Sequence, residues 1–431
     1  MLEAVKSTTA RKIASNTLYQ VIGKTITMTV TVLITVIVAR QLGRDAYGQF
    51  NIMQAFPALF FIIADFGFNA IATRDLSTDW KKAESYLGNI LAMRLVFSAV
   101  LILVSGVALF FFPYSYLLRV GVQLGLLLIL TQALFATTNI IFQVKLRYDL
   151  STIGLVSGYA LILLISVLAA FKGWHVMWIN FSYVVGGLAS FLINLHFIRK
   201  LGISISLRFN KVLWRYLILQ SLPLGLMFIF SQVNFKSDSI LLSVLQLPGH
   251  LNLSATGSVG VYGLPYKIFE VSLVLPTFFM NSVYPVLVRH MIESKDKLKT
   301  TFRNSMLALF AVGLAVGIGG YFLSPLMINI LGGSEFALSI PVLRILLGGV
   351  VVFYLSQPIS WLIVTLGKQI YLPYIYLVAA IFNVSMNLVF IPRYSFFASS
   401  YLTWISELVL LVLLVFFAGR AWNQKYEKAK A

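Results

Sequence analysis

The chain has 431 residues, 59% of them hydrophobic and only 11% charged, with a formal net charge of +19. This apolar fraction exceeds what the core of a soluble globular protein needs, so the composition excludes an ordinary soluble domain and favours a membrane protein. Cysteine is absent, which excludes disulfide bonds, thiolate metal sites and cysteine nucleophiles.

Apolar stretches of about 20 residues, the length that crosses about 30 Å of hydrocarbon as a helix, recur along the whole chain. Each is predicted to be helical, because a lone strand would leave unpaired backbone groups in lipid. No cleavable signal peptide is expected before the first stretch, since the segment before Asn16 is short and polar. Spans are expected near residues 16–39, 48–72, 88–112, 119–143, 151–171 and 175–198, and then near 213–246, 259–288, 303–326, 339–366, 369–391 and 396–420.

A polar linker with four Lys or Arg residues, at positions 199–211, separates the two sets of spans and predicts two six-helix lobes, residues 1–207 and 208–431. With the N-terminus in the cytoplasm, most of the 33 Lys and Arg residues fall in inside segments, as the positive-inside rule requires. We therefore predict a multi-pass protein of the cell (cytoplasmic) membrane with both termini in the cytoplasm. The basic charge reports topology and does not predict nucleic-acid binding.

The two halves contain similar segments at one common offset. Tyr47-Gly48, after the first span, has a counterpart in Tyr262-Gly263, and Arg74 at the end of the second span has one in Arg289. Parallel repeats of this kind place a pseudo-twofold axis along the membrane normal and a cleft between the halves. The repeat agrees with the position of the polar linker.

Motifs spread along the chain resemble those of one transporter family. The opening segments resemble the polysaccharide-transporter flippases of the multidrug/oligosaccharidyl-lipid/polysaccharide (MOP) exporter superfamily, at Asn16–Tyr19, Ala39–Gly43, Tyr47-Gly48 and Asp65–Gly67. The start of the second half and the last helical hairpin resemble the same family, at Ser221–Pro223, Asn383, Asn387, Ile391–Tyr394 and Ser406-Glu407. The turn after Tyr394 departs from the family, because Ser395, Phe396 and Phe397 stand where glycines and alanine are usual.

The resemblance implies an all-α fold like that of the MATE multidrug exporters, a V-shaped pair of six-helix lobes around a cavity lined by spans 1, 2, 7 and 8. It further implies alternating-access transport of a polyprenyl-pyrophosphate-linked oligosaccharide from the inner to the outer leaflet. The implied partners are this lipid-linked oligosaccharide, membrane lipid, and glycosyltransferase or polymerase machinery.

Polar residues of the first span form one helical stripe, at Asn16, Gln20, Lys24, Thr27, Thr31 and Thr35. In one interpretation the threonines bond their own backbone and only the lysine needs a partner. In the other, the stripe lines an aqueous path for a polar headgroup. The predicted headgroup site comprises Gln20, Lys24, Thr27 and Thr31, together with Lys236 and Lys267 from spans 7 and 8.

Charged residues inside spans are costly, at about 2.5–3.5 kcal/mol for a central Lys, Arg or Asp, so they normally pair or meet water. Their depths predict an inner pair, Lys24 with Asp65, and an outer cluster of Lys236, Asp238, Lys267 and Glu270. Two roles are open for each of these groups. Its charges neutralise one another in a structural role, or they take part in transport. In the second case Lys24 meets the pyrophosphate, and the carboxylates Asp65, Asp238 and Glu270 are candidates for charge pairing or for binding a coupling proton or Na⁺.

Other polar residues and the prolines of the spans have structural expectations. Arg94 is expected to snorkel to the cytoplasmic surface, and Glu407 to make a structural hydrogen bond to a neighbour. Helix kinks are expected at the prolines of spans 2, 7 and 8, which are Pro57, Pro223, Pro265, Pro276 and Pro285.

No catalytic or metal site is predicted. The four histidines are isolated from carboxylates at metal-ligand spacing, and no phosphate loop or nucleophile elbow is visible. A transporter without a cofactor, apart from a coupling ion, is therefore expected. Two alternatives stay open, a cation-coupled multidrug exporter on the same fold and a membrane scaffold of a glycan-assembly complex. The cationic residues of the spans favour the flippase, because an exporter of cationic drugs requires an acidic cavity.

Overall fold

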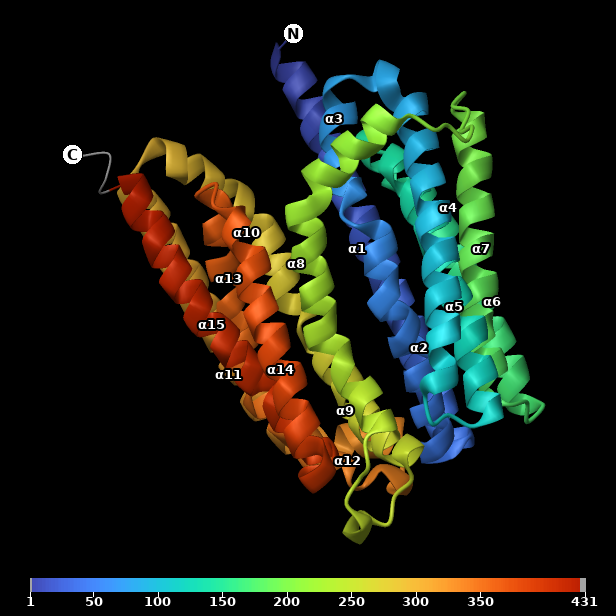
Figure 1. Ribbon diagram of the computed structural model, residues 1–431. Coiled ribbons are helices and arrows are strands. Elements are labelled where there is room, and N and C mark those ends of the chain that lie inside the picture. Colours follow the sequence, from blue (N-terminus) through green and yellow to red (C-terminus); the bar gives the residue numbers. More distant parts are fainter. Residues whose placement is uncertain (1, 427–431) are drawn as a thin grey trace. The chain divides into compact units, whose positions relative to one another are not determined.

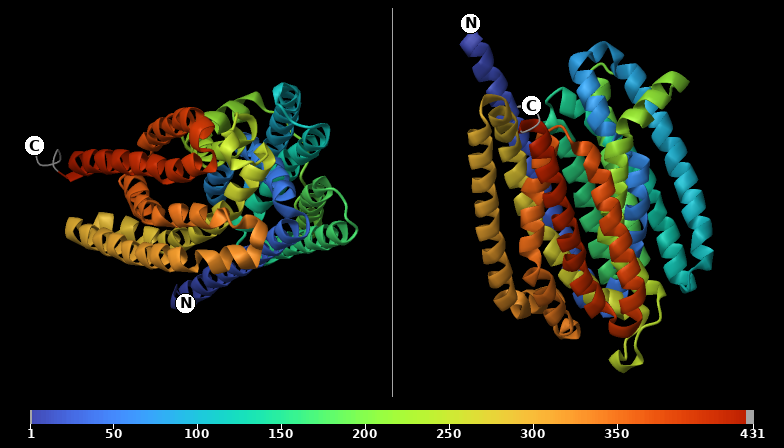
Figure 2. Two further views of the ribbon diagram at one scale, coloured as in Figure 1. Left: turned by 90° about the horizontal axis from the view of Figure 1, so that it is seen from below. Right: turned by 60° about the vertical axis from the view of Figure 1, so that its left-hand side comes forward.

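The computed structural model describes residues 2–426, with side chains for residues 15–249 and 251–426, and the helices and short 3₁₀ turns of this part are its only regular elements (Figure 1). Twelve stretches are long and apolar enough to cross a membrane. The prediction of an all-α protein with twelve spans is confirmed. Contacts divide the chain into two units (Figure 2).

The first unit comprises the chain up to Leu42 together with Ile52–Gly225. Its elements are α1 (Leu2–Gln41), most of α2 (Gly43–Asp65), α3 (Phe68–Thr78), η1 (Trp80–Lys82), α4 (Ala83–Ala108), η2 (Leu109–Phe111), α5 (Tyr116–Val144), α6 (Tyr148–Phe171), α7 (Val176–Lys200) and the start of α8 (Lys211–Val244). Helix α5 packs against α3, α4 and α7, and α6 packs against α1 and α7. Apolar residues of α3, α4 and α5 form a buried core, with Phe68, Leu87 and Phe142 among them.

The second unit comprises Gly43–Asn51 together with the chain after Gly225. Its elements are the rest of α8, η3 (Gly249–Leu251), α9 (Ala255–Ser272), α10 (Val274–Glu293), α11 (Lys295–Leu331), η4 (Ser334–Phe336), α12 (Ser339–Gly348), α13 (Val350–Thr365), η5 (Gln369–Tyr371), α14 (Leu372–Tyr394) and α15 (Phe396–Tyr426). Helix α13 packs against α10, α11 and α15, and α15 also packs against α14.

The boundary between the two units lies inside α8, after Gly225, whereas the charge pattern predicted lobes of residues 1–207 and 208–431. Backbone contacts explain where the polar linker packs. The amide of Asn210 donates to Asn89 Oδ1 at 2.7 Å, and the amide of Arg208 donates to the carbonyl of Gly88 at 3.3 Å. The linker and the first turns of α8 therefore pack with the first unit.

The second span is broken between α2 and α3. Phe66 and Gly67 both adopt left-handed backbone angles, with φ of 45° and 74°. Glycine adopts such angles without steric cost, whereas phenylalanine adopts them at a cost. Gly67 therefore makes the break between the two helices easier to form. The break lies directly after Asp65, a charged residue of this span.

The eighth span is broken at Leu273, between α9 and α10. Pro276 has no backbone N–H, so the carbonyl of Ser272, four residues earlier, loses its helical donor. The Tyr354 hydroxyl of α13 donates to that carbonyl at 2.7 Å and replaces the missing bond. The expected distortion of this span is therefore present, and it lies at Pro276.

The first turns of α2 belong to the second unit because they cross α9 at very short range. A Cβ on Gly48 would overlap the backbone carbonyl of Thr256, so only glycine fits the crossing. Gly263 of α9 in turn lies directly against the Asn51 side chain of α2. The glycines of the repeated Tyr-Gly pairs thus lie along one pair of crossing helices.

Candidate functional site

The predicted headgroup stripe of α1 separates into residues with different surroundings. Asn16 is buried and holds α1 against the start of α6, donating to the Leu146 carbonyl at 2.7 Å and accepting from the Tyr148 amide at 2.8 Å. Gln20 and Lys24 have exposed side chains. Within the described residues Lys24 forms no ion pair.

Two threonines of the same stripe donate hydrogen bonds to their own helix. Thr27 is buried and its hydroxyl donates to the Lys24 carbonyl at 3.0 Å, and half-buried Thr31 donates to the Thr27 carbonyl at 2.8 Å. Back-bonding of this kind removes the need for an outside partner. Of the four residues of α1 predicted for the headgroup site, Gln20 and Lys24 are therefore the ones open to a ligand.

The predicted pair of Lys24 and Asp65 is wrong, because Asp65 forms its ion pair with Arg94 of α4. Arg94 has 0% of its side chain exposed, so the expectation that it snorkels to the surface is wrong as well. Its guanidinium also donates to Asn69 Oδ1 and Thr137 Oγ1, each at 2.9 Å. Depth along the helices suggested Lys24 as the partner of Asp65, but the packing of α3 and α4 on α5 makes Arg94 the partner instead.

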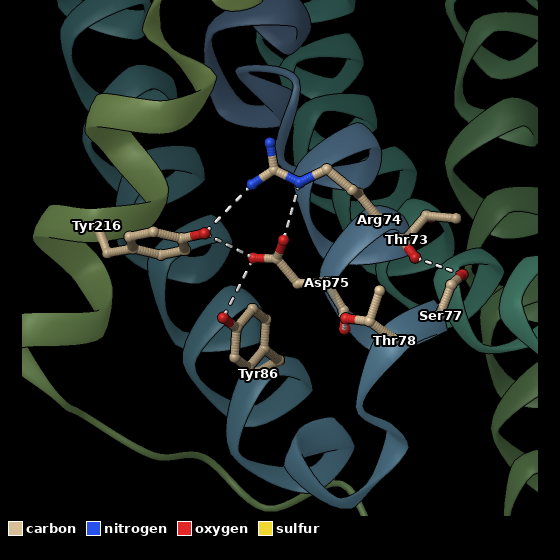
Figure 3. A network of polar contacts seen from close by, with 7 residues as sticks. All are labelled: Thr73, Arg74, Asp75, Ser77, Thr78, Tyr86 and Tyr216. Atoms are coloured by element: carbon tan, nitrogen blue, oxygen red, sulfur yellow. Dashed lines mark hydrogen bonds and ion pairs between the residues drawn. The ribbon is translucent and has the colours of Figure 1, made fainter.

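A second polar network of the first unit was not predicted (Figure 3). Asp75 of α3 accepts from Arg74 Nε at 2.9 Å, from the Tyr216 hydroxyl at 3.0 Å and from the Tyr86 hydroxyl at 3.2 Å. Arg74 also donates to the Tyr216 hydroxyl at 3.2 Å, and about half of its side chain, 54%, stays exposed. This network joins α3, α4 and the start of α8. The sequence signal that could have pointed to Asp75 is the scarcity of acids, since only 14 Asp and Glu residues occur in the chain.

In the second unit, Lys236 of α8 and Lys267 of α9 share one carboxylate. Lys236 is ion-paired and hydrogen-bonded to Glu270, and Lys267 Nζ lies 3.2 Å from the same side chain. The three side chains are partly exposed, by 23%, 37% and 25%. Two ammonium groups against one carboxylate leave this lysine cluster, Lys236, Lys267 and Glu270, with one unit of positive charge.

Asp238 forms no ion pair with the lysine cluster, although it was predicted in the same outer group. It is 1% exposed and accepts hydrogen bonds from the Tyr262 hydroxyl at 2.8 Å, Asn387 Nδ2 at 3.0 Å and the Thr403 hydroxyl at 3.1 Å. All three partners are neutral, and the described residues supply no cation to this carboxylate. Asp238 is therefore a buried acid surrounded by hydrogen-bond donors.

The polar residues of the last helical hairpin form a second layer around Asp238. Asn383 accepts from Ser237 at 3.0 Å and donates to Ser406 at 3.3 Å, and Asn387 accepts from Ser399 at 3.0 Å. The motif residues Asn383, Asn387 and Ser406 thus position groups that face the acid. Such a connected network keeps the donors of Asp238 in place.

Glu407 of α15 is also buried, at 5% exposure, and accepts a hydrogen bond from the Ser356 hydroxyl of α13. The expected structural hydrogen bond is confirmed. No group of three or more His, Cys, Asp or Glu residues that could hold a metal ion occurs in the described part of the chain.

Comparison with known proteins agrees with this architecture. The model of the family described as "Polysaccharide biosynthesis protein" matches residues 13–291. No curated protein matches the chain in sequence.

Solved structures share the fold at low identity. The lipid II flippase MurJ, in an inward closed conformation, is 15% identical with a TM-score of 0.72, covering 93% of this chain and 87% of that one. An inward-facing multidrug resistance MATE family transporter of the MOP superfamily is 14% identical with a TM-score of 0.71, covering 92% and 96%. A MOP superfamily transporter from Pyrococcus furiosus, described as having a binding pocket of reverse polarity, is 15% identical with a TM-score of 0.63, covering 96% and 95%.

These structures are of transporters and a flippase. Their low identity to this chain means that they establish its fold and not its substrate. The family match extends over more than half of the chain. The protein therefore belongs to the polysaccharide biosynthesis protein family and has the fold of the MOP superfamily transporters.

Proposed function

We propose that the protein translocates a polyprenyl-pyrophosphate-linked oligosaccharide from the inner to the outer leaflet of the cytoplasmic membrane by alternating access. The observation that carries this proposal is the lysine cluster, which keeps a net positive charge on partly exposed side chains within membrane helices. A cation at membrane depth is costly unless it meets water or an anion. A pyrophosphate headgroup supplies that anion.

Lys24 supports the same proposal in the first unit. Its exposed ammonium lies in a membrane span and, among the described residues, has no carboxylate partner. Gln20, one helical turn earlier, adds an exposed amide that can bond phosphate or sugar oxygens. Thr27 and Thr31 are less suited to the headgroup because their hydroxyls already donate to α1.

The alternative of a cation-coupled multidrug exporter has less support. Such a transporter requires free acids in its cavity, whereas here Asp238 and Glu407 are buried and the partly exposed Glu270 is ion-paired with two lysines. The alternative of a scaffold for a glycan-assembly complex does not account for unpaired charge at membrane depth. Glycosyltransferase or polymerase machinery remains a candidate partner of a flippase in polysaccharide biosynthesis.

Asp238 is the proposed site of ion coupling, and the proposed ion is a proton. An ionised carboxylate in a buried site costs free energy unless charge or hydrogen bonds compensate it. The Tyr262 and Thr403 hydroxyls can donate to the ionised acid and accept from the protonated one, so both states find partners. Asp65 and Glu270 are less suited to this role, because each already has a cationic partner.

Two single substitutions test the lysine cluster. Lys267→Gln lowers its net charge to zero, whereas Glu270→Gln raises it, and both break the same contact. In proteoliposomes we expect Lys267→Gln to slow translocation of a fluorescent polyprenyl-pyrophosphate disaccharide by at least about tenfold, since a charge-assisted hydrogen bond contributes about 1.5–3 kcal/mol. Glu270→Gln should keep most of the activity. Translocation is measured as the fluorescence that becomes accessible to a membrane-impermeant quencher.

Equal loss of activity in both variants would assign the lysine cluster a structural role and remove it from the headgroup site. Lys172→Gln, an exposed lysine between α6 and α7, serves as the control for general effects of losing one cation. Transport of a cationic dye without translocation of the disaccharide lipid would instead identify the protein as a multidrug exporter.

A further inference from the structure

The first unit contains a cavity of about 420 Å³ that plays no part in the proposed function. Residues of helices α4, α5 and α7 and of the linker after α7 line it, and most of these residues are apolar. They include Leu91 of α4, Phe191 and Leu195 of α7, and Ile203 and Ile205 of the linker. Its volume lies within the ~300–1,000 Å³ typical of pockets that hold small ligands.

The polar groups at the base of this cavity already have partners within the protein. Thr137 of α5 accepts from Arg94 and donates to the Ala133 carbonyl, both at 2.9 Å. Thr138 donates to the Phe135 carbonyl at 2.7 Å and accepts from Asn194 at 3.1 Å. These threonines therefore need nothing from a ligand, and the cavity suits an apolar chain.

The linker, which forms one wall of the cavity, is attached to α4 by hydrogen bonds and an ion pair. Ser204 donates to Glu84 Oε1 at 3.3 Å, and the Arg208 guanidinium lies 3.3 Å from Glu84 Oε2. The backbone contacts of Arg208 and Asn210 with α4 add to this attachment. Ile203 and Ile205 thus line a cavity whose linker wall is bonded to α4.

Arg199 lines the same cavity at the last turn of α7. Its side chain is exposed, and within the described residues it forms no ion pair, whereas the nearby Arg208 is paired with Glu84. This end of α7 is the one that the charge distribution assigns to the cytoplasm. The cavity therefore combines an apolar interior with a free cation at the level of lipid headgroups.

We infer that this cavity binds an anionic phospholipid, with the phosphate on Arg199 and the end of one acyl chain between α4, α5 and α7. Basic pockets between membrane helices on the cytoplasmic side recognise acidic headgroups in this way. The guanidinium suits a phosphate because it can donate two parallel hydrogen bonds. The site is separate from the residues proposed to bind the transported headgroup.

The test uses the purified full-length protein in detergent, with phosphatidylglycerol and phosphatidylcholine of identical acyl chains compared by native mass spectrometry. We expect preferential binding of phosphatidylglycerol and an affinity about fivefold lower in Arg199→Gln, since a basic residue near a membrane surface contributes ~1 kcal/mol. The control is Lys200→Gln, which removes an adjacent exposed cation that does not line the cavity and should bind nearly as the unchanged protein does.

A phosphatidylglycerol that carries a photoreactive group at the end of one acyl chain locates the site without relying on a variant. Crosslinks should fall on the residues that line the cavity, which are Leu91, Thr137, Thr138 and members of residues 191–205, and Leu195→Trp, which fills the cavity, should reduce them. Crosslinks elsewhere, or equal binding of both phospholipids, would overturn the inference. Binding of a polyprenyl phosphate without binding of phosphatidylglycerol would overturn it too, by assigning the cavity to the carrier lipid.

Discussion

Arg94 and Asp65 neutralise each other at membrane depth in the first unit, and each depends on the other. Arg94 is fully buried and has three side-chain acceptors, Asp65, Asn69 and Thr137. Removing one partner of a buried ion pair leaves an uncompensated charge, which is costlier than removing both partners. The location of Asp65 at the end of α2 means that this pair also anchors the break between α2 and α3.

Substitution of Arg94 by Met should destabilise the protein by about 3–5 kcal/mol, because Asp65 loses its counter-charge. The double variant with Asp65→Asn should recover part of the lost stability. Lys24→Gln should change stability little, whether it is introduced into the unchanged protein or into the Asp65→Asn variant, which is itself destabilised because Arg94 loses its counter-charge. Thermal unfolding of the detergent-purified variants measures all four effects, and a rescue of Lys24→Gln by Asp65→Asn would contradict the pairing described here.

Asp238 is the buried acid whose loss should affect coupling more than folding. Asp238→Asn keeps the size of the side chain and its acceptor oxygen but cannot exchange a proton. We expect the variant to fold and to lose the response of translocation to an imposed pH gradient in proteoliposomes. Asp79→Asn, at a partly exposed acid directly after α3, provides the control. A normal pH response in Asp238→Asn would exclude this residue as the coupling site.

At the scale of elements, broken helices distinguish this fold from a bundle of straight spans. The second span breaks at Phe66–Gly67, the eighth at Leu273 and the tenth at Gly349. Each break frees backbone groups that would need partners in lipid. At Leu273 the freed carbonyl of Ser272 is bonded by Tyr354, so a residue of α13 is required for the shape of the α9–α10 span.

Tyr354→Phe should lower the free energy of unfolding by about 1–3 kcal/mol, because the Ser272 carbonyl would lose its donor. The ring, which is buried, would stay in place. Thermal unfolding measures the change, with Tyr374→Phe at an exposed position as the matched control. Equal stability of the two variants would mean that water or another group satisfies the carbonyl.

At the scale of the whole molecule, the membrane topology follows from charge and span number together. Single cysteines can report it, because the chain has none of its own. Lys172→Cys should react in intact cells with a membrane-impermeant maleimide, whereas Lys211→Cys should react only after the membrane is permeabilised. Both positions are exposed, so the difference would reflect sidedness. Labelling of Lys211→Cys from outside would invert the proposed topology.

Several features of the site were predictable because they depend on few residues. The hydrogen bond of Glu407 and the presence of Lys236 and Lys267 in one charged cluster follow from the rule that charged residues in membrane spans find partners. The back-bonding of Thr27 and Thr31 follows from their spacing on one helix. The partner of Asp65 and the network around Asp75 were not predictable, because the rotation and packing of the helices decide which of several polar residues meet.

The sequence by itself determined the class of the protein, its twelve spans and its helical content, since hydropathy and charge add up along the chain and lipid allows only helices here. The tertiary structure decided which charges meet. Depth along a span can be counted from the sequence, but the rotation and tilt of each helix, and the breaks within it, depend on packing against its neighbours. For this reason Arg94 is paired with Asp65, Lys24 stays exposed, and Asp238 lies among neutral donors.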